Sequence, residues 1–345
     1  MREKARADIE RAEALSPEAV ETLVARGYYH YWGFLDYERA DAVIDRALVK
    51  APSNAEVWAL KGYVARRSGR FDESIDAIRR AYSLDPLSEE IPWQLAQSYL
   101  QFNRFEDAQA IVDHARALDP KRERVFTMDV RIMLTSGEFE RAWTLINETT
   151  PGSGWSSYYF LRLITATVSR DPEKITFALE SFPTDQLVYP GNPEIFALTK
   201  AEALAAMGLD EESQTLLNEI NERIKASDDP YPAGWSANAT YLPVQLPGLM
   251  GDLEGVRAAV ADFEANAAPD AFADLTRHYA IARAFERAGD RDAAFEYLGK
   301  IADVVGPAEY LGVKFDPDFD GIRDDPRYLA MKAEYEAWAA EHDGG

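Results

Sequence analysis

The chain has 345 residues, of which 47% are hydrophobic, so it can bury one to three compact cores. Its formal net charge of −23 opposes binding to a nucleic-acid backbone or to an anionic membrane surface. The absence of cysteine excludes disulfide bonds, thiol chemistry and cysteine metal ligands.

The N-terminal stretch "MREKARADIE" contains basic residues, but no apolar segment of a signal peptide follows it. No part of the sequence reaches the run of about 20 apolar residues that spans a bilayer. We therefore expect no direct membrane insertion. We also expect a cytoplasmic location, with the periplasm left open because a chain without cysteine suits either compartment.

Four prolines, Pro17, Pro52, Pro86 and Pro120, recur at intervals of 34 or 35 residues. The twelfth and fifth residues before each proline are small, and the eighth is apolar. These positions hold Ala5, Ile9 and Ala12; Ala40, Ile44 and Ala47; Ser74, Ile78 and Ala81; and Ala108, Val112 and Ala115. Small residues let two helices approach closely, and apolar residues three or four positions apart form a buried face. The pattern predicts repeated helix pairs.

This 34-residue helix-turn-helix period resembles the tetratricopeptide repeat. The resemblance implies an all-α fold, a right-handed superhelix (α-solenoid) with a regular front half and a degenerate rear half. We expect regular repeats over residues 1–150, and degenerate helix pairs with a C-terminal capping helix over residues 151–345. Both parts would belong to the same continuous solenoid.

A finer likeness lies in "ARGYYHYWGFLDYERA" (25–40), "GYVARRSGRFDESI" (62–75) and "KFDPDFDGIRDDPRYLAM" (314–331). These stretches resemble the tetratricopeptide arrays that follow nucleotide-cyclase or winged-helix regulator domains in bacterial signalling proteins. Ala5, Ile9 and Ala12 also occupy second-helix positions, so the sequence starts within a repeat. We expect a fragment of a longer protein with an upstream effector domain. The alternative is that Met1 is the true start and the half repeat docks as a cap.

Further helix pairs are predicted at 125–151, 157–181, 194–226, 237–265 and 271–304, with turns at Gly137, Gly208 and Gly289. Irregular loops are predicted at 182–194 and 227–235, a break at 151–154, and a single amphipathic helix at 326–341. No alternation typical of β-strands stands out.

The sequence matches no phosphate-binding loop, no G-x-S-x-G elbow and no H-E-x-x-H zinc pair, so we expect no enzyme, no cofactor and no metal. One stretch, "DPDFDGIRDDPR" (316–327), begins like an EF-hand calcium loop with Asp316, Asp318 and Asp320. Its second half does not fit, because Arg327 replaces the bidentate glutamate. We interpret the stretch as Asp-initiated turns followed by a helix cap at Asp325.

Aromatic residues and arginines alternate along the first helices of the repeats, which line the concave face of such arrays. The predicted partner-binding groove comprises Tyr28, Tyr31, Trp32, Tyr63, Arg66, Arg67, Trp93, Gln97, Gln101 and Arg131. Such a surface suits a peptide with carboxylates. Alternatively, the aromatic residues are core and the arginines balance Glu56, Glu73 and Glu90.

The predicted function is a non-catalytic protein–protein interaction scaffold that binds a peptide or partner protein in this groove. The alternative is the regulatory or sensory part of a larger bacterial signalling protein, such as a nucleotide cyclase or transcription regulator. Ala59 and Trp93 stand where the carboxylate clamp of chaperone-binding arrays needs lysine, which disfavours chaperone tails as partners.

Overall fold

The computed structural model describes residues 2–152, 155–181, 193–226, 241–266, 270–305 and 310–342. Within these ranges the regular structure is helical, with no strand, and none of the helices is both long and apolar enough to cross a membrane. The chain divides into two compact units. Unit 1 is Met1–Leu118 with Ala267–Asp274, and unit 2 is Asp119–Asn266 with Leu275–Gly345. The boundary at residue 150 in the sequence analysis separates regular from degenerate repeats and not compact units, and it stays a prediction.

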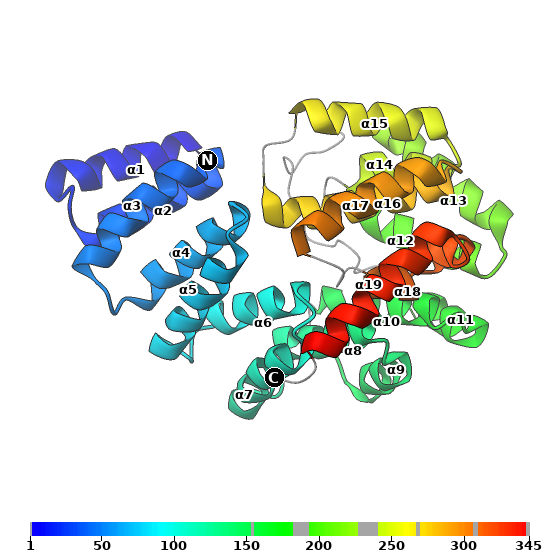
Figure 1. Cartoon of the computed structure of the whole chain (residues 1–345), viewed down its shortest axis with the longest axis horizontal. Helices are drawn as coiled ribbons and strands as arrows, with labels where there is room; N and C mark the ends of the chain where they lie inside the picture. The colour runs from blue at the N-terminus through cyan, green and yellow to red at the C-terminus, as the bar shows by residue number, and fades with distance from the viewer. Residues whose placement is uncertain are drawn as a thin grey trace. The chain divides into compact units, whose positions relative to one another are not determined.

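Unit 1 contains one leading helix and three helix pairs, coloured blue to cyan in Figure 1. The leading helix is α1 (Arg2–Leu15). The pairs are α2 (Val20–Phe34) with α3 (Tyr37–Lys50), α4 (Ala55–Arg67) with α5 (Phe71–Leu84), and α6 (Ile91–Gln101) with α7 (Phe105–Leu118). Each helix pair therefore follows the proline period of the sequence.

The positions counted back from the prolines form the contact faces of these pairs. Ala40, Ile44 and Ala47 on α3 are at most 1% exposed, and so are their counterparts Ser74, Ile78 and Ala81 on α5. The same position is exposed at Ala5 on α1. On the partner helix α4, a Cβ atom at Gly62 would lie 2.4 Å from Ile78 Cγ1. Only glycine allows α4 and α5 to approach this closely.

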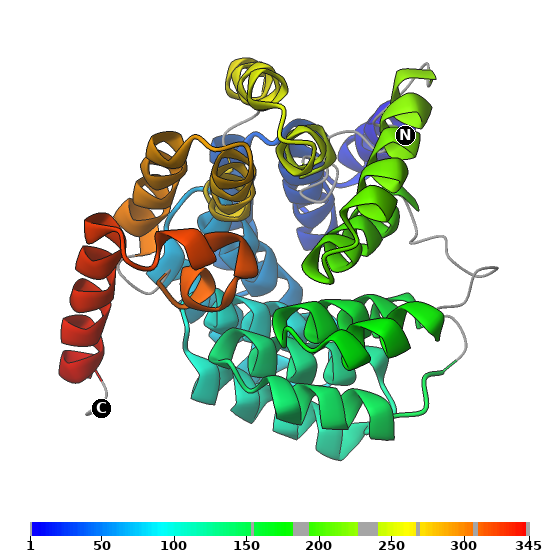
Figure 2. The same ribbon diagram turned by 90° about the vertical axis from the view of Figure 1, so that its right-hand side faces the viewer.

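Unit 2 continues with further helix pairs, and Figures 1 and 2 show α8, α9 and α10 packed in succession. Its helices are α8 (Glu123–Ser136), α9 (Phe139–Glu148), α10 (Ser156–Val168), α11 (Pro172–Glu180), α12 (Pro193–Ala206), α13 (Asp210–Ala226), α14 (Tyr241–Leu249), α15 (Leu253–Asn266), α16 (Ala271–Arg287), α17 (Arg291–Val305), α18 (Tyr310–Phe315), the 3₁₀ helix η2 (Pro317–Ile322) and α19 (Pro326–His342). The first turn of α16 groups with unit 1.

The predicted pairs of the rear half are present as helices. Gly137, Gly208 and Gly289 each adopt a positive φ, between 73° and 86°, at the turns predicted from the sequence. This left-handed conformation ends a helix at little cost only where the residue has no Cβ atom. The predicted loops at 182–194 and 227–235, and part of the break at 151–154, lie outside the described residues.

Candidate functional site

The predicted groove residues lie on four helices. Tyr28, Tyr31 and Trp32 are on α2; Tyr63, Arg66 and Arg67 on α4; Trp93, Gln97 and Gln101 on α6; and Arg131 on α8. Arg131 belongs to unit 2 and the other nine to unit 1. The structure brings Tyr31, Tyr63, Arg66 and Arg67 together, and it surrounds them with residues that the sequence analysis did not identify.

Arg67 is the centre of a buried ionic contact in unit 1. Its Nε donates to the Tyr31 hydroxyl at 3.2 Å, and its Nη1 donates to Asp270 Oδ2. The Tyr37 hydroxyl donates to the same carboxylate oxygen at 3.1 Å. The side chain of Asp270 is only 4% exposed. Burial lowers the pKa of Arg67, but the neighbouring Tyr31 and Asp270 outweigh it and raise that pKa above its ordinary value. Arg67 therefore keeps its positive charge.

Arg66 is still more buried, with 3% of its surface exposed. It donates to Ser98 Oγ at 3.1 Å and to Gln94 Oε1 at 2.6 Å, both on α6. Its guanidinium carbon lies 4.1 Å from the centre of the Phe272 ring, a cation–π contact. Its buried Nε has no hydrogen-bond partner among the described residues. Burial lowers the pKa of Arg66 to about 10.

Asp270 and Phe272 begin helix α16. Asp270 Oδ1 accepts from the backbone N–H of Ala273 at 3.0 Å, so this residue is an N-cap. Its other oxygen, Oδ2, is the one that faces Arg67 and Tyr37. We call the surface formed by Tyr31, Tyr37, Arg66 and Arg67 the arginine site. It accommodates the start of a helix that carries a carboxylate and, two residues later, a phenyl ring.

The other groove residues of unit 1 are not part of the arginine site. Trp32 is 62% exposed, and the centre of its ring lies 5.8 Å from the guanidinium carbon of Arg67. Tyr28 is half-buried, and burial and Glu56 raise its pKa to about 12. Trp93, Gln97 and Gln101 are half-buried on α6. Glu73, considered above as a balancing charge for the arginines, instead pairs with Lys61 and Arg70.

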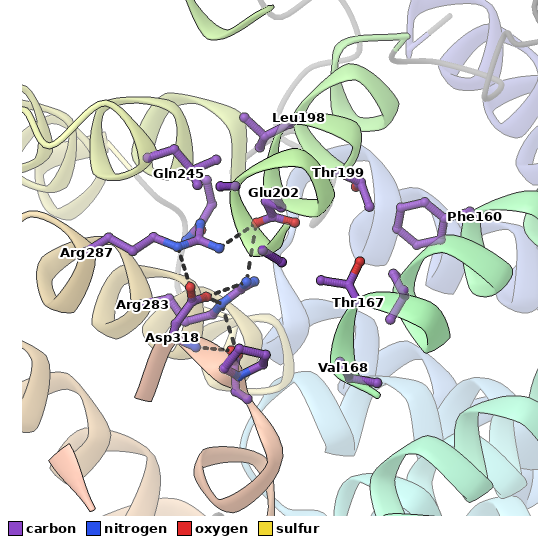
Figure 3. A pocket seen from close by; sticks show the side chains of 16 residues that line it. Phe160, Thr167, Val168, Leu198, Thr199, Glu202, Gln245, Arg283, Arg287 and Asp318 are labelled. Atoms are coloured by element: carbon purple, nitrogen blue, oxygen red, sulfur yellow. Dashed lines mark hydrogen bonds and ion pairs between the residues drawn. The ribbon is translucent and has the colours of Figure 1, made fainter. Parts of the chain in front are cut away.

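Unit 2 contains a cavity of about 590 Å³ that the sequence analysis did not predict. Five elements line it, namely α10, α12, α14, α16 and the turn at η2. Its lining residues are Phe160, Ile164, Thr167, Val168, Leu198, Thr199, Glu202, Ala205, Ala206, Gln245, Leu249, Arg283, Arg287, Asp316, Pro317 and Asp318. Figure 3 shows polar side chains on one side, with Phe160, Thr167 and Val168 of α10 opposite them.

The polar side of this cavity is an ionic cluster. Arg287 donates to Asp318 Oδ1 at 2.7 Å, to Glu202 Oε1 at 2.8 Å and to Gln245 Oε1 at 2.8 Å. Arg283 pairs with Asp318 at 2.6 Å, with Asp316 at 3.0 Å and with Glu202 at 3.3 Å. The five charged side chains are between 11% and 23% exposed. The turn at η2 is thus held against α12 and α16.

The two aspartates of the cluster differ in their electrostatic surroundings. Burial raises the pKa of Asp316, which lies beside the negative Asp318 as well as Arg283. Burial acts in the same direction on Asp318, but Arg283 and Arg287 outweigh it and lower the pKa of that carboxyl. Asp316 therefore binds a proton more readily than Asp318 does, because Asp316 pairs with Arg283 alone whereas Asp318 pairs with both Arg283 and Arg287.

The half calcium loop of the sequence analysis falls in this cluster. Asp316 Oδ1 accepts from the backbone N–H of Asp318 at 3.0 Å, which is the expected Asp-initiated turn. Asp325 accepts from the backbone N–H of Arg327 at 2.9 Å as α19 begins. The side chains of Asp316 and Asp318 pair with arginines, whereas in a calcium loop the corresponding carboxylates coordinate the cation.

Comparison with known proteins agrees with the helix pairs described above. The family model of the tetratricopeptide repeat matches residues 65–128. A tetratricopeptide repeat protein from Parabacteroides merdae has a similar structure, with a TM-score of 0.50 and 14% identity over 83% of this chain and 98% of that one. This chain contains tetratricopeptide repeats. The predicted all-α tetratricopeptide solenoid is therefore confirmed.

Two further solved structures have TM-scores below 0.5 with this chain. PilF of Pseudomonas aeruginosa has a TM-score of 0.37 and 15% identity, over 72% of this chain and 92% of that one. A human IFIT1 dimer with m7Gppp-AAAA has a TM-score of 0.46 and 16% identity, over 87% and 78%. No curated protein matches. Tetratricopeptide repeats serve in general as non-catalytic scaffolds for protein–protein interaction, because stacked helix pairs create extended binding surfaces.

Proposed function

We propose that this tetratricopeptide-repeat protein binds a partner protein through the arginine site of unit 1. The partner segment is the start of a helix that carries an aspartate at its N-cap and an aromatic residue two positions later. The observation that carries the proposal is that Asp270 and Phe272 of this chain occupy the site in this way. The predicted groove is thereby narrowed to Tyr31, Arg66 and Arg67, with Tyr37 added.

The chemistry of the site supports recognition of such a segment. A guanidinium–carboxylate contact is charge-assisted, and it is stronger here because Asp270 is almost fully buried. A carboxylate at an N-cap leaves one oxygen for Arg67 while the other satisfies a backbone N–H of its own helix. The ring of Phe272 covers the face of Arg66, a group that is costly to bury without such a contact.

The test uses the full chain and a synthetic peptide of residues 266–282, "NAAPDAFADLTRHYAIA". The double variant Asp270→Asn, Phe272→Ala frees the site of its own segment, while asparagine keeps the N-cap. We expect the peptide to bind this variant more tightly than it binds the unaltered chain, as measured by calorimetry.

A matched pair of substitutions decides whether binding is at the arginine site. In the double variant, Arg67→Gln should weaken peptide binding at least about tenfold, since it removes a buried charge-assisted hydrogen bond. As the matched control, Arg70→Gln should leave the affinity unchanged, because Arg70 lies beyond the end of α4, at the N-cap of α5, where it pairs with Glu73. Equal peptide affinity of the Arg67→Gln and Arg70→Gln variants, or no peptide binding by the double variant, would contradict the proposal.

A further inference from the structure

The cavity of unit 2 has the dimensions and the lining of a small-molecule site. Its volume of about 590 Å³ lies within the range of roughly 300–1,000 Å³ that ligand pockets occupy. Apolar side chains from three helices form most of the wall, among them Phe160, Ile164, Leu198 and Leu249. The charged side chains converge on one side, as Figure 3 shows, and the facing wall carries no charge, its polar groups being the hydroxyls of Thr167 and Thr199. A ligand that fits this cavity has an apolar body and one polar end.

The charges of the ionic cluster indicate which charge the polar end of the ligand carries. Glu202, Asp316 and Asp318 supply three carboxylates, whereas Arg283 and Arg287 supply two guanidinium groups. The polar side of the cavity therefore has one more carboxylate than it has guanidinium groups. Net charge in a poorly solvated site is costly, and a cation offsets that cost where a second anion would add to it.

Glu202 is the carboxylate best placed to receive a cation. Both arginines reach this residue through the same oxygen, Oε1. Within the described part of the chain, its Oε2 accepts no hydrogen bond, and in Figure 3 the second oxygen of Glu202 lies on the side that faces Thr167 and Phe160. The donors of Arg287 are meanwhile engaged by Asp318, Glu202 and Gln245.

We propose that the cavity binds a small amphipathic amine, with its apolar body against Phe160, Ile164, Leu198 and Leu249 and its ammonium group against Glu202. The ammonium group completes the charge balance of the cluster without displacing either arginine. This site is separate from the arginine site of unit 1, and its ligand is a small molecule and not a protein segment.

Three probes that share one apolar body test the proposal on the full chain. They are naphthalen-2-ylmethylamine, naphthalen-2-ylmethanol and 2-naphthoate, which differ in the charge of the polar end. We expect the amine to bind about tenfold more tightly than the alcohol, as a charge-assisted hydrogen bond predicts, and the carboxylate to bind least. Calorimetry measures all three affinities. Binding of the carboxylate as tight as that of the amine would overturn the proposal.

Three variants locate the binding. Glu202→Gln should remove the preference for the amine over the alcohol, whereas Glu173→Gln, an exposed glutamate on α11, should leave it unchanged. Ala206→Trp fills the cavity from an exposed position on α12 and should weaken both probes at least about tenfold, with the carboxylates intact. An amine affinity that Glu202→Gln and Ala206→Trp both leave unchanged would mean general attraction to an acidic protein, and would refute the site.

Discussion

Replacing Gly62 by alanine tests the closest helix contact of unit 1. The added Cβ atom would lie 2.4 Å from Ile78 Cγ1, 3.0 Å from the carbonyl oxygen of Ser74 and 3.1 Å from the backbone nitrogen of Ile78. Two of these three atoms belong to the backbone of α5. A rotation of the Ile78 side chain therefore cannot relieve the overlap, and α4 and α5 must move apart.

Two opposing effects determine the size of the loss. Alanine stabilises a helix interior by about 1 kcal/mol relative to glycine. Overpacking a well-packed core costs about 1–3 kcal/mol, and a shift of two helix backbones belongs to the upper part of that range. We expect the free energy of unfolding to fall by about 1–2 kcal/mol in Gly62→Ala.

Urea denaturation followed by circular dichroism measures the change, with Gly33→Ala as the control in the same unit. A Cβ atom at Gly33 would lie 3.6 Å from its nearest neighbour, an ordinary contact with the Tyr29 ring. This variant should gain about 0.5–1 kcal/mol from helix propensity alone. If Gly62→Ala proves as stable as Gly33→Ala, the close approach of α4 and α5 is not required and the argument from repeat geometry fails.

Two further predictions concern helix N-caps. Asn54 Oδ1 accepts from the backbone N–H of Val57 at 3.1 Å, so Asn54→Ala should cost about 1 kcal/mol in urea denaturation, while Asn54→Asp should keep most of the stability. Asp290 accepts from Arg257 at 2.8 Å and from the Ala293 N–H at 3.2 Å, and these bonds lower its pKa below the ordinary 3.8. A lowered pKa adds stability above 3.8 that is lost as the pH falls, so Asp290→Asn, which keeps the cap, should be less stable than the unaltered chain near neutral pH and equal to it in strong acid. An Asn54→Ala chain as stable as the original, or a stability difference for Asp290→Asn that persists in acid, would refute the respective assignment.

The repeat architecture could be predicted because its signal is local. Ala40, Ile44 and Ala47 contact a helix that is adjacent in sequence, so spacing from Pro52 was enough to identify a buried face. The turn glycines, such as Gly137, were recognisable for the same reason. These expectations were confirmed because each helix packs mainly against the helix that is next to it in sequence.

The partners of the functional side chains could not be predicted in the same way. Arg66 and Arg67 were identified as candidates, but the carboxylate and ring that they contact lie about 200 residues further along the chain. Glu202, Arg283 and Asp318 come from three elements with no fixed spacing, and the sequence around Asp318 resembled half of a calcium loop. A charge pattern indicates where polar groups lie along a helix, but not which distant helix will neutralise them.

The occupation of the arginine site by Asp270 and Phe272 has a consequence for binding strength. These residues are attached to the chain whose site they occupy, so dilution does not lower their local concentration, which for a tethered segment reaches the millimolar range or above. A free partner must compete with this high local concentration. Its apparent dissociation constant is its intrinsic dissociation constant divided by the fraction of chains in which the arginine site is open. Under the proposed function, the unaltered chain therefore discriminates against weak ligands and favours those that present the same aspartate and ring with better contacts around them.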